Sequence, residues 1–237
     1  MNIALILAGG VGNRFGNPTP KQFLAVYKKP LIVYAMEAFQ SHPEIDAISV
    51  VCLEGWEKKL LKYVENYKIK KFKWIFKGGA TGQESIRNGV FGLEKVCKQS
   101  DIILIHDAVR PLVSHEIISE CIYACRRFGS GIASIPCVEA ILKKKEVFIG
   151  HEIVPRESLV RTQTPQAFRL SKLIWAYREA LKRGITNSVA ACTLMIELGG
   201  EVRLCHGSEI NLKITTSEDL EIFKALLKHK RKLKKNK

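Results

Sequence analysis

Short apolar runs alternate with amphipathic stretches along most of the 237-residue chain. The apolar runs have the length expected of buried strands and lie at residues 3–7, 47–53, 72–76, 102–105 and 132–136. Apolar positions spaced by three and four predict helices at residues 30–39, 56–64, 84–96, 117–127, 170–182 and 189–198, with a last helix from Ser217. A final pair of strands is expected near residues 202–205 and 212–214. This alternation predicts an α/β fold with a mostly parallel central sheet and helices on both faces.

Residues 137–156 do not follow this alternation. They contain Lys143-Lys144-Lys145 and short β-like pieces, which predicts an arm projecting from the domain, with a plain surface hairpin as the alternative. A length of 237 residues suits one α/β domain, which we place at residues 1–227, arm included. Residues 228–237 form a basic C-terminal tail.

Positive charge is concentrated at the end of the chain. The net charge is +15, and seven of these charges lie in the tail at residues 228–237. Because no aromatic residues are interleaved with these charges, we do not expect nucleic-acid binding, whereas the positive body suits an anionic substrate. The apolar runs are far shorter than the ~20 residues of a membrane helix, so we expect a cytoplasmic protein without a membrane span.

The chain contains seven cysteines, an odd number, and no two of them have CxxC spacing. Most lie in apolar patterns, which favours reduced, buried thiols. Cys121 and Cys125 are four residues apart on an expected helix. Core packing is favoured over a metal or redox pair there, because no histidine stands nearby at ligand spacing.

The first apolar run ends in a glycine loop, Ala8-Gly9-Gly10-Val11-Gly12. Such a loop lies at the carboxyl edge of the sheet, where α/β proteins bind ligands. Without Cβ atoms, its backbone N–H groups can approach a phosphate closely. The dinucleotide fingerprint is excluded because its third glycine position holds Phe15, and a P-loop is excluded because no Gly-Lys-Ser/Thr occurs in the chain.

Two cations follow this loop at fixed spacing, Arg14 and Lys21. When a phosphate oxygen attacks the α-phosphorus of a nucleotide, negative charge builds on the phosphoryl oxygens and on departing pyrophosphate, and preorganised cations stabilise it. No general base is needed, since the attacking phosphate is ionised at neutral pH. The pattern L-A-G-G-x-G-x-R-F-G, followed by Pro20-Lys21-Gln22, resembles the signature of nucleotidyltransferases that join a nucleoside triphosphate to a sugar or polyol phosphate.

Four later motifs narrow the resemblance. They are Gly78-Gly79-Ala80 with Ser85, HDAVRP at residues 106–111, QTPQAF at residues 163–168, and NLKITTSEDL at residues 211–220. In this order and over nearly the whole chain, they are similar to the 2-C-methyl-D-erythritol 4-phosphate cytidylyltransferase family. The resemblance implies a single Rossmann-like nucleotidyltransferase domain that transfers CMP from CTP to the polyol phosphate with Mg²⁺, a step of non-mevalonate isoprenoid synthesis. It also implies a homodimer formed through the arm.

The family's site residues can be carried over where the motifs match. The triphosphate loop corresponds to Ala8, Gly9, Gly10 and Gly12, and the cations that stabilise the α-phosphate to Arg14 and Lys21. The cytosine pocket corresponds to Gly79, Ala80 and Ser85, and the strand-end acid suited to Mg²⁺ is Asp107. The polyol phosphate would be held by Arg110, Arg156, Thr164 and Lys213, with Arg156 and Lys213 orienting the attacking group.

The chain departs from the family at three places. Pro136 is followed by Cys137-Val138-Glu139-Ala140 instead of Asp-Thr, the usual Thr-Asp-Asp/Glu-Ala reads Thr186-Asn187-Ser188-Val189, and the usual arginine three residues after Gly79 is Gly82. The nucleotide half therefore matches better than the acceptor half. A cytidylyltransferase acting on ribitol 5-phosphate or a similar polyol phosphate is the alternative. A non-catalytic nucleotide-binding protein is less favoured, because Arg14 and Lys21 are both present.

Overall fold

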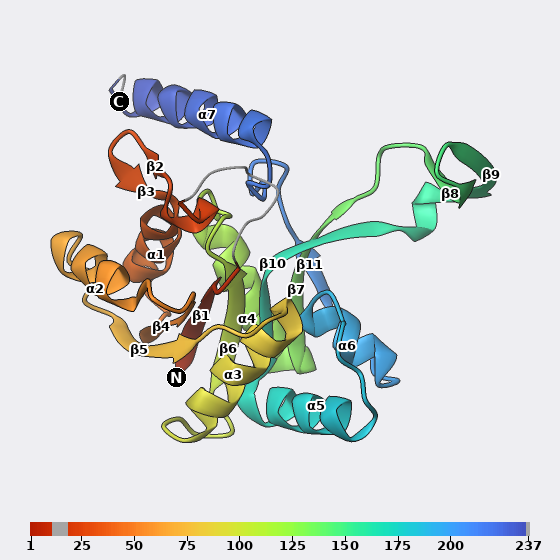
Figure 1. Ribbon diagram of the computed structural model, residues 1–237, viewed down its shortest axis with the longest axis horizontal. Coiled ribbons are helices and arrows are strands. Elements are labelled where there is room, and N and C mark those ends of the chain that lie inside the picture. Colours follow the sequence, from red (N-terminus) through yellow and green to blue (C-terminus); the bar gives the residue numbers. More distant parts are fainter. Residues whose placement is uncertain (11–18, 236–237) are drawn as a thin grey trace.

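The computed structural model describes residues 1–10 and 19–235, with side chains up to Lys230. A seven-stranded sheet runs through the centre of the molecule (Figure 1). Its strands are β1 (Asn2–Ala8), β4 (Ala47–Cys52), β5 (Phe72–Lys77), β6 (Ile102–Asp107), β7 (Ser130–Pro136), β10 (Val160–Arg169) and β11 (Leu204–His206), in the spatial order β11-β7-β10-β6-β1-β4-β5. Only β10 runs antiparallel to its neighbours, which confirms the expected mostly parallel sheet.

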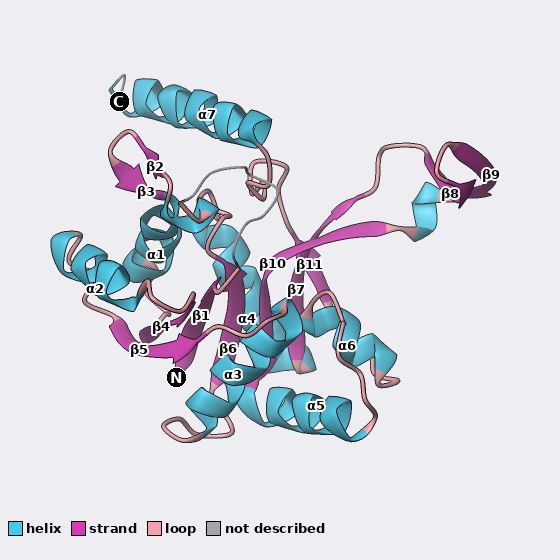
Figure 2. Cartoon of the chain, viewed as in Figure 1, coloured by secondary structure: helices cyan, strands magenta, loops and turns pink. Residues whose placement is uncertain are grey.

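Two helical layers cover the sheet (Figure 2). The helices α1 (Leu31–Ser41), α2 (Glu57–Asn66) and α4 (His115–Phe128) pack on one face. The other face is covered by α3 (Gly82–Glu94), α5 (Leu170–Lys182) and α6 (Ala191–Glu197). Each layer has its own apolar core, as expected for strands that are buried on both sides.

Local sequence signals fix the ends of the helices that border the site. Thr81 caps α3 by accepting a hydrogen bond from the N–H of Glu84 at 3.1 Å, and Ser114 caps α4 in the same way. Gly129 ends α4 with a left-handed backbone, φ 84°, a conformation that glycine adopts without a Cβ clash. Helix α3 therefore starts directly after the loop at residues 78–80.

The last helix, α7 (Ser217–Lys235), packs against α1 through Phe223 and Leu227. Helix α7 includes residues 228–235. Most of the basic run that we expected as a tail is therefore part of this helix. No helix in the described part of the chain is both long enough and apolar enough to span a membrane.

The arm is present as a two-stranded hairpin, β8 (Ile141–Glu146) and β9 (Ile149–Val154), that extends away from the sheet (Figure 2). The short turn η3 (Arg156–Ser158) follows it. A second small hairpin, β2 (Ala25–Val26) with β3 (Lys29–Pro30), precedes α1. All seven cysteines are free thiols, and all but Cys97 are buried, as expected.

Two expected elements differ in the structure. Strand β10 was not predicted, because its interior carries Gln163, Pro165 and Gln166 instead of an apolar run. Residues 212–214, expected as a strand, belong to an irregular segment between β11 and α7. Ile214 in this segment is buried against the α7 cluster, which accounts for its apolar character.

Candidate active site

A cavity of about 600 Å³ opens at the carboxyl ends of β1 and β6. It brings together nine residues that the sequence predicted for the site: Ala8, Gly9, Gly10, Lys21, Gly79, Ala80, Ser85, Asp107 and Lys213. These residues come from five separate stretches of the chain. Gly12 and Arg14, which were also predicted, lie outside the described residues.

The glycine turn after β1 forms one wall of this cavity. A Cβ on Gly9 would lie 3.1 Å from Cα of Gly78 and 3.0 Å from Oγ of Ser85, so the turn packs directly on the neighbouring loop. Among the described residues, no hydrogen-bond partner engages the N–H of Gly9 or Gly10. Gly9 is buried, and buried backbone N–H groups are rarely left unpaired, whereas Gly10 is exposed. The turn therefore presents two N–H groups without an internal partner at the cavity, and that of Gly9 is the buried one.

The loop at residues 78–80 forms the adjoining wall. The hydroxyl of Ser85 accepts a hydrogen bond from the N–H of Gly79 at 3.0 Å, and a carboxylate oxygen of Glu84 accepts one from the N–H of Ala80 at 2.8 Å. A Cβ on Gly79 would lie 2.3 Å from Cγ of Glu84, so glycine is required for this close approach. Ser85 thus shapes the loop and lines the cavity with the same side chain.

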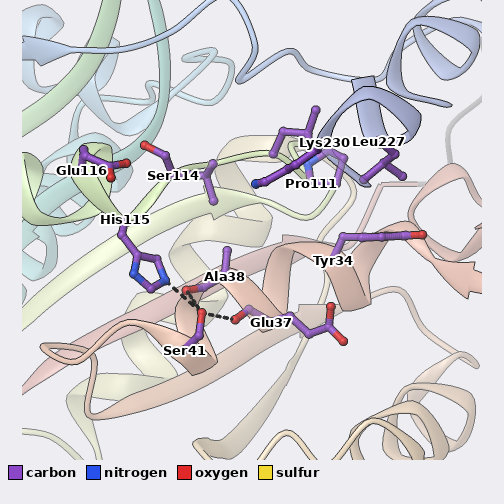
Figure 3. A pocket seen from close by; sticks show the side chains of 12 residues that line it. Tyr34, Glu37, Ala38, Ser41, Pro111, Ser114, His115, Glu116, Leu227 and Lys230 are labelled. Carbon is purple, nitrogen blue, oxygen red and sulfur yellow. Dashed lines mark hydrogen bonds between the residues drawn. The ribbon is translucent and has the colours of Figure 1, made fainter. Parts of the chain in front are cut away.

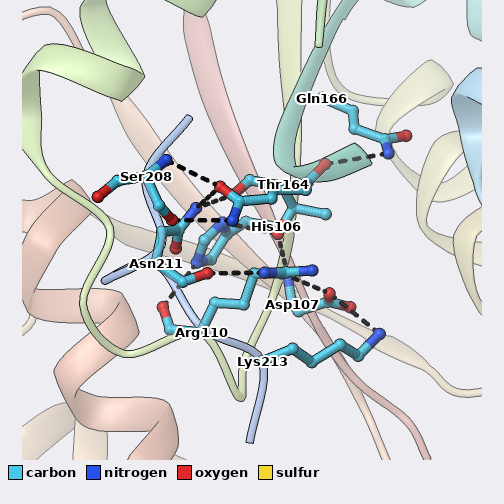
Figure 4. A network of polar contacts seen from close by, with 9 residues as sticks. His106, Asp107, Arg110, Thr164, Gln166, Ser208, Asn211 and Lys213 are labelled. Atoms are coloured by element: carbon cyan, nitrogen blue, oxygen red, sulfur yellow. Dashed lines mark hydrogen bonds and ion pairs between the residues drawn. The ribbon is translucent and has the colours of Figure 1, made fainter. Parts of the chain in front are cut away.

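Asp107, the last residue of β6, has cations on both sides (Figure 4). Its Oδ2 atom lies 3.2 Å from Nε of Arg110 and 3.1 Å from Nζ of Lys213. Burial by itself opposes ionisation of Asp107, but the positive charges of Lys213 and Arg110 outweigh it and lower the pKa of the carboxyl group. Asp107 is therefore a carboxylate at neutral pH, and its ion pair holds Lys213 at the cavity wall.

Thr164 lies next to Asp107 (Figure 4) and is buried. Its Oγ1 accepts a hydrogen bond from the N–H of Asp107 at 3.1 Å and lies 3.1 Å from Nδ1 of His106. The other ring nitrogen of His106, Nε2, lies 3.0 Å from the carbonyl oxygen of Arg110. These contacts make Thr164 a support for Asp107, whereas the sequence predicted a direct contact with the polyol phosphate.

Arg110 is also turned inward. Its NH1 group donates to the backbone carbonyl of Asn211 at 2.7 Å, and its side chain is mostly buried. Arg110, which the sequence predicted to hold the acceptor phosphate, therefore links Asp107 to the segment that carries Lys213. Lys213 lines the cavity, whereas Arg110 does not.

A model of a known protein family matches nearly the whole chain. The model described as IspD, 2-C-methyl-D-erythritol 4-phosphate cytidylyltransferase, matches residues 2–229. The chain belongs to this family.

Individual members of the cytidylyltransferase family match over nearly their full length. A ribitol-5-phosphate cytidylyltransferase of Lacticaseibacillus paracasei is 40% identical over 232 residues, which are 97% of this chain and 99% of the relative. A 2-C-methyl-D-erythritol 4-phosphate cytidylyltransferase of Clostridium tetani is 36% identical over 220 residues, covering 92% and 87%. The crystal structure of 2-C-methyl-D-erythritol 4-phosphate cytidylyltransferase from Thermus thermophilus has a TM-score of 0.75 at 27% identity, covering 95% of this chain and 98% of that one. The fold is thus that of the cytidylyltransferase family.

Arg156 lies apart from the cavity in this chain, at the base of the arm. Its side chain is 55% exposed and contacts the carbonyl oxygen of Val138 at 2.9 Å and the carboxylate of Glu157 at 3.3 Å. It is not among the residues that line the cavity. The described single chain therefore does not bring Arg156 together with Lys213.

A second cavity, of about 580 Å³, lies between α1, the start of α4 and α7 (Figure 3). His115 extends into it and its Nε2 lies 2.9 Å from the hydroxyl of Ser41. The lining combines acidic Glu37 and Glu116 with Lys230 and has no glycine turn. The cavity at the end of β1 is thus the better candidate for binding a nucleotide.

Sequence reasoning missed four polar residues that support the site. His106 and Asn211 are fully buried, and Gln22 and Gln163 are nearly so. Each lies inside a motif that was used for the resemblance: Pro20-Lys21-Gln22, HDAVRP, QTPQAF and NLKITT. A buried polar side chain needs hydrogen-bond partners, and a polar residue within an apolar stretch is the signal that could have found them.

Proposed function

We propose that the protein transfers CMP from CTP to a polyol phosphate and releases pyrophosphate. One observation carries this proposal: the unengaged N–H groups of Gly9 and Gly10 share a cavity with Lys21 and with the Asp107–Lys213 pair. This combination suits a polyanion placed between a backbone donor set and fixed cations. Family membership supports a cytidylyl group as the part transferred.

The protein's own residues would act mainly by positioning charge. A phosphate oxygen of the acceptor forms a new bond to the α-phosphorus of CTP, and the bond from that phosphorus to the β-phosphate bridging oxygen breaks. Lys21, with Arg14 as the second proposed cation, would stabilise the charge on the α-phosphoryl oxygens and on the leaving pyrophosphate. Lys213 would hold the acceptor phosphate, which needs no deprotonation at neutral pH. Holding both phosphates in line supplies much of the rate acceleration.

Asp107 is the residue we propose for holding Mg²⁺. Both of its ion pairs use Oδ2, and no described residue contacts Oδ1. The described residues contain no group of three or more His, Cys, Asp or Glu side chains that could hold a metal. Mg²⁺ is commonly bound by one or two carboxylates together with substrate phosphates, so a single carboxylate fits. When bound, the ion would neutralise charge on the triphosphate.

For the acceptor we propose ribitol 5-phosphate, with 2-C-methyl-D-erythritol 4-phosphate as the second candidate. Relatives named for ribitol 5-phosphate match at 37% to 41% identity, against 36% and 35% for two named for methylerythritol phosphate. The segment after Pro136 supports this order, because it reads Cys137-Val138-Glu139-Ala140 and lacks the Asp-Thr that the methylerythritol family usually has shortly after this proline. The motifs taken alone had favoured methylerythritol phosphate.

We also propose a homodimer formed through the arm. Its apolar side chains are exposed in the single chain, with Phe148 at 98%, Ile153 at 77% and Val147 at 75%. Exposed apolar clusters of this kind mark interaction sites. Arg156 lies at the base of this arm, so pairing of two arms is the route by which it would reach a nucleotide site.

A pyrophosphate-release assay tests the proposal. CTP, ATP, GTP and UTP are each combined with ribitol 5-phosphate, methylerythritol phosphate or glycerol 3-phosphate, with and without EDTA. We expect turnover with CTP and ribitol 5-phosphate that EDTA abolishes and added Mg²⁺ restores. Preference for a purine nucleotide would refute the nucleotide assignment. Turnover with methylerythritol phosphate alone would make the second candidate the acceptor.

A further inference from the structure

Gln22 is a buried polar residue that the proposed chemistry does not use. It follows Lys21 in the single 3₁₀ turn η2 (Lys21–Phe23) and is 2% exposed. The next residue, Phe23, stacks on Trp56 with ring centroids 4.6 Å apart. This turn thus places a cation at the cavity, an amide beneath it and an aromatic ring in the core, in three consecutive positions.

The amide of Gln22 contacts both ends of the described glycine turn. Its Nε2 donates to the carbonyl oxygen of Ala8 and to that of Gly10, both at 2.8 Å. The carbonyl oxygen of Ala8 also accepts from the N–H of Leu53 at 3.1 Å, so both of its acceptor positions are used. The peptide unit between Ala8 and Gly9 is therefore held from two sides.

This arrangement sets the direction of the Gly9 N–H. In a trans peptide unit, the C=O and N–H bonds point in opposite directions. With the Ala8 carbonyl fixed toward Gln22 and Leu53, the Gly9 N–H points away from them. Because glycine has little conformational preference of its own, an unsupported turn at Gly9-Gly10 would sample other orientations.

We propose that Gln22 is a positioning residue for the triphosphate: it holds the start of the glycine turn so that the Gly9 N–H is directed at the bound phosphates. This inference rests on the proposed function, since it assumes that the cavity takes a nucleoside triphosphate. Gln22 touches the turn and acts on the phosphates through it. Its contribution therefore belongs to the phosphates beyond the nucleoside, and loss of Gln22 spares binding of the nucleoside part.

Binding of CTP and CMP to the full-length protein tests this role by calorimetry. In Gln22→Met, which keeps the side-chain length but removes both donors, we expect the Kd of CTP to rise about 10- to 100-fold, since two hydrogen bonds that fix the turn are lost. The Kd of CMP should stay within about threefold, because CMP lacks the β- and γ-phosphates. A general loss of site structure would weaken both nucleotides alike.

Gln40→Met is the matched control. The Oε1 atom of Gln40 accepts from the N–H of Lys71 at 2.8 Å, just before β5 begins and so at the opposite edge of the sheet. This variant also loses a side-chain contact of a glutamine to the backbone, here one in which the amide oxygen accepts, and both Kd values should stay at the wild-type level. Gln22→Leu, which also lacks the amide donors and carries no charge, repeats the test should the methionine variant unfold.

Two results would overturn the role of Gln22: a CTP Kd within threefold of wild type in both Gln22 variants, or a parallel rise of the CTP and CMP Kd values. If the proposed function itself is wrong, the wild-type protein will bind CTP no more tightly than CMP. That result would remove the role of Gln22 as well.

Discussion

His106 makes the stability of this protein dependent on pH. Its ring is fully buried beneath Asp107, and burial lowers the pKa of His106 from 6.5 to about 4. The unfolded chain binds a proton at this histidine below pH 6.5, whereas the native protein binds it only below about pH 4. Unfolding therefore takes up a proton between these values, and the free energy of unfolding falls as the pH falls. The stabilisation that comes from keeping His106 neutral is therefore lost as the pH falls from about 6.5 to about 4.

The size of this effect follows from the two pKa values. With 6.5 in the unfolded chain and about 4 in the native protein, lowering the pH from 7 to 5 costs about 2 kcal/mol of stability through His106 alone. This is a large part of the 5–15 kcal/mol that is typical of a folded domain.

Urea unfolding followed by circular dichroism at pH 7 and pH 5 measures this loss. We compare wild type with His106→Gln, in which an amide can donate to the Arg110 carbonyl without titrating. The variant should be less stable at pH 7 but should lose about 2 kcal/mol less than wild type on going to pH 5. His151→Gln removes an exposed histidine on the arm and should behave as wild type. Equal losses in wild type and His106→Gln would refute the reasoning.

Four further predictions follow from the site and the arm. Lys21→Ala should lower kcat by about 10² with the fold intact, measured by pyrophosphate release and circular dichroism, and near-normal turnover would contradict its role. Lys213→Ala removes a positive charge from Asp107, so the pKa of that carboxyl rises and the acid limb of the kcat/KM profile should move to higher pH. Phe148→Asp should convert a dimer to a monomer in sedimentation experiments, whereas an unchanged mass would argue against the arm as the interface. Truncation after Leu227 keeps the apolar contacts of α7 and should leave turnover unchanged; a loss of activity would assign the basic end of α7 a part in catalysis.

Most of the fold could be predicted from the sequence because burial on a strand or helix leaves a local pattern. The apolar runs at residues 3–7 and 47–53 became β1 and β4, and the capped helices start within a few residues of their expected positions. Strand β10 could not be found in this way. It is an inner strand, but its buried Gln163 and Gln166 are satisfied by partners elsewhere in the chain, so its sequence reads as polar.

The residues of the candidate site also differ in whether the sequence could predict their place. The glycine turn and Lys21 were predicted from residue types and spacing, and Asp107 and Lys213 from the family resemblance; the structure places all of them around one cavity. The sequence assigned Thr164 to the substrate, since nothing local shows that its hydroxyl contacts the N–H of Asp107, 57 positions away. Contacts of this kind depend on strand order.

The sequence by itself determined the alternation of strands and helices and the glycine turn that ends the first strand, because each depends on neighbours within a few positions. The tertiary structure alone decided which side chains face the cavity and which support it from below. Insertion of β10 beside β6 puts Thr164 under Asp107, and the return of the chain after β11 brings Lys213 to the same carboxylate. The physical reason is that a buried polar group is stable only with its partner, and here the partners lie far apart in the chain.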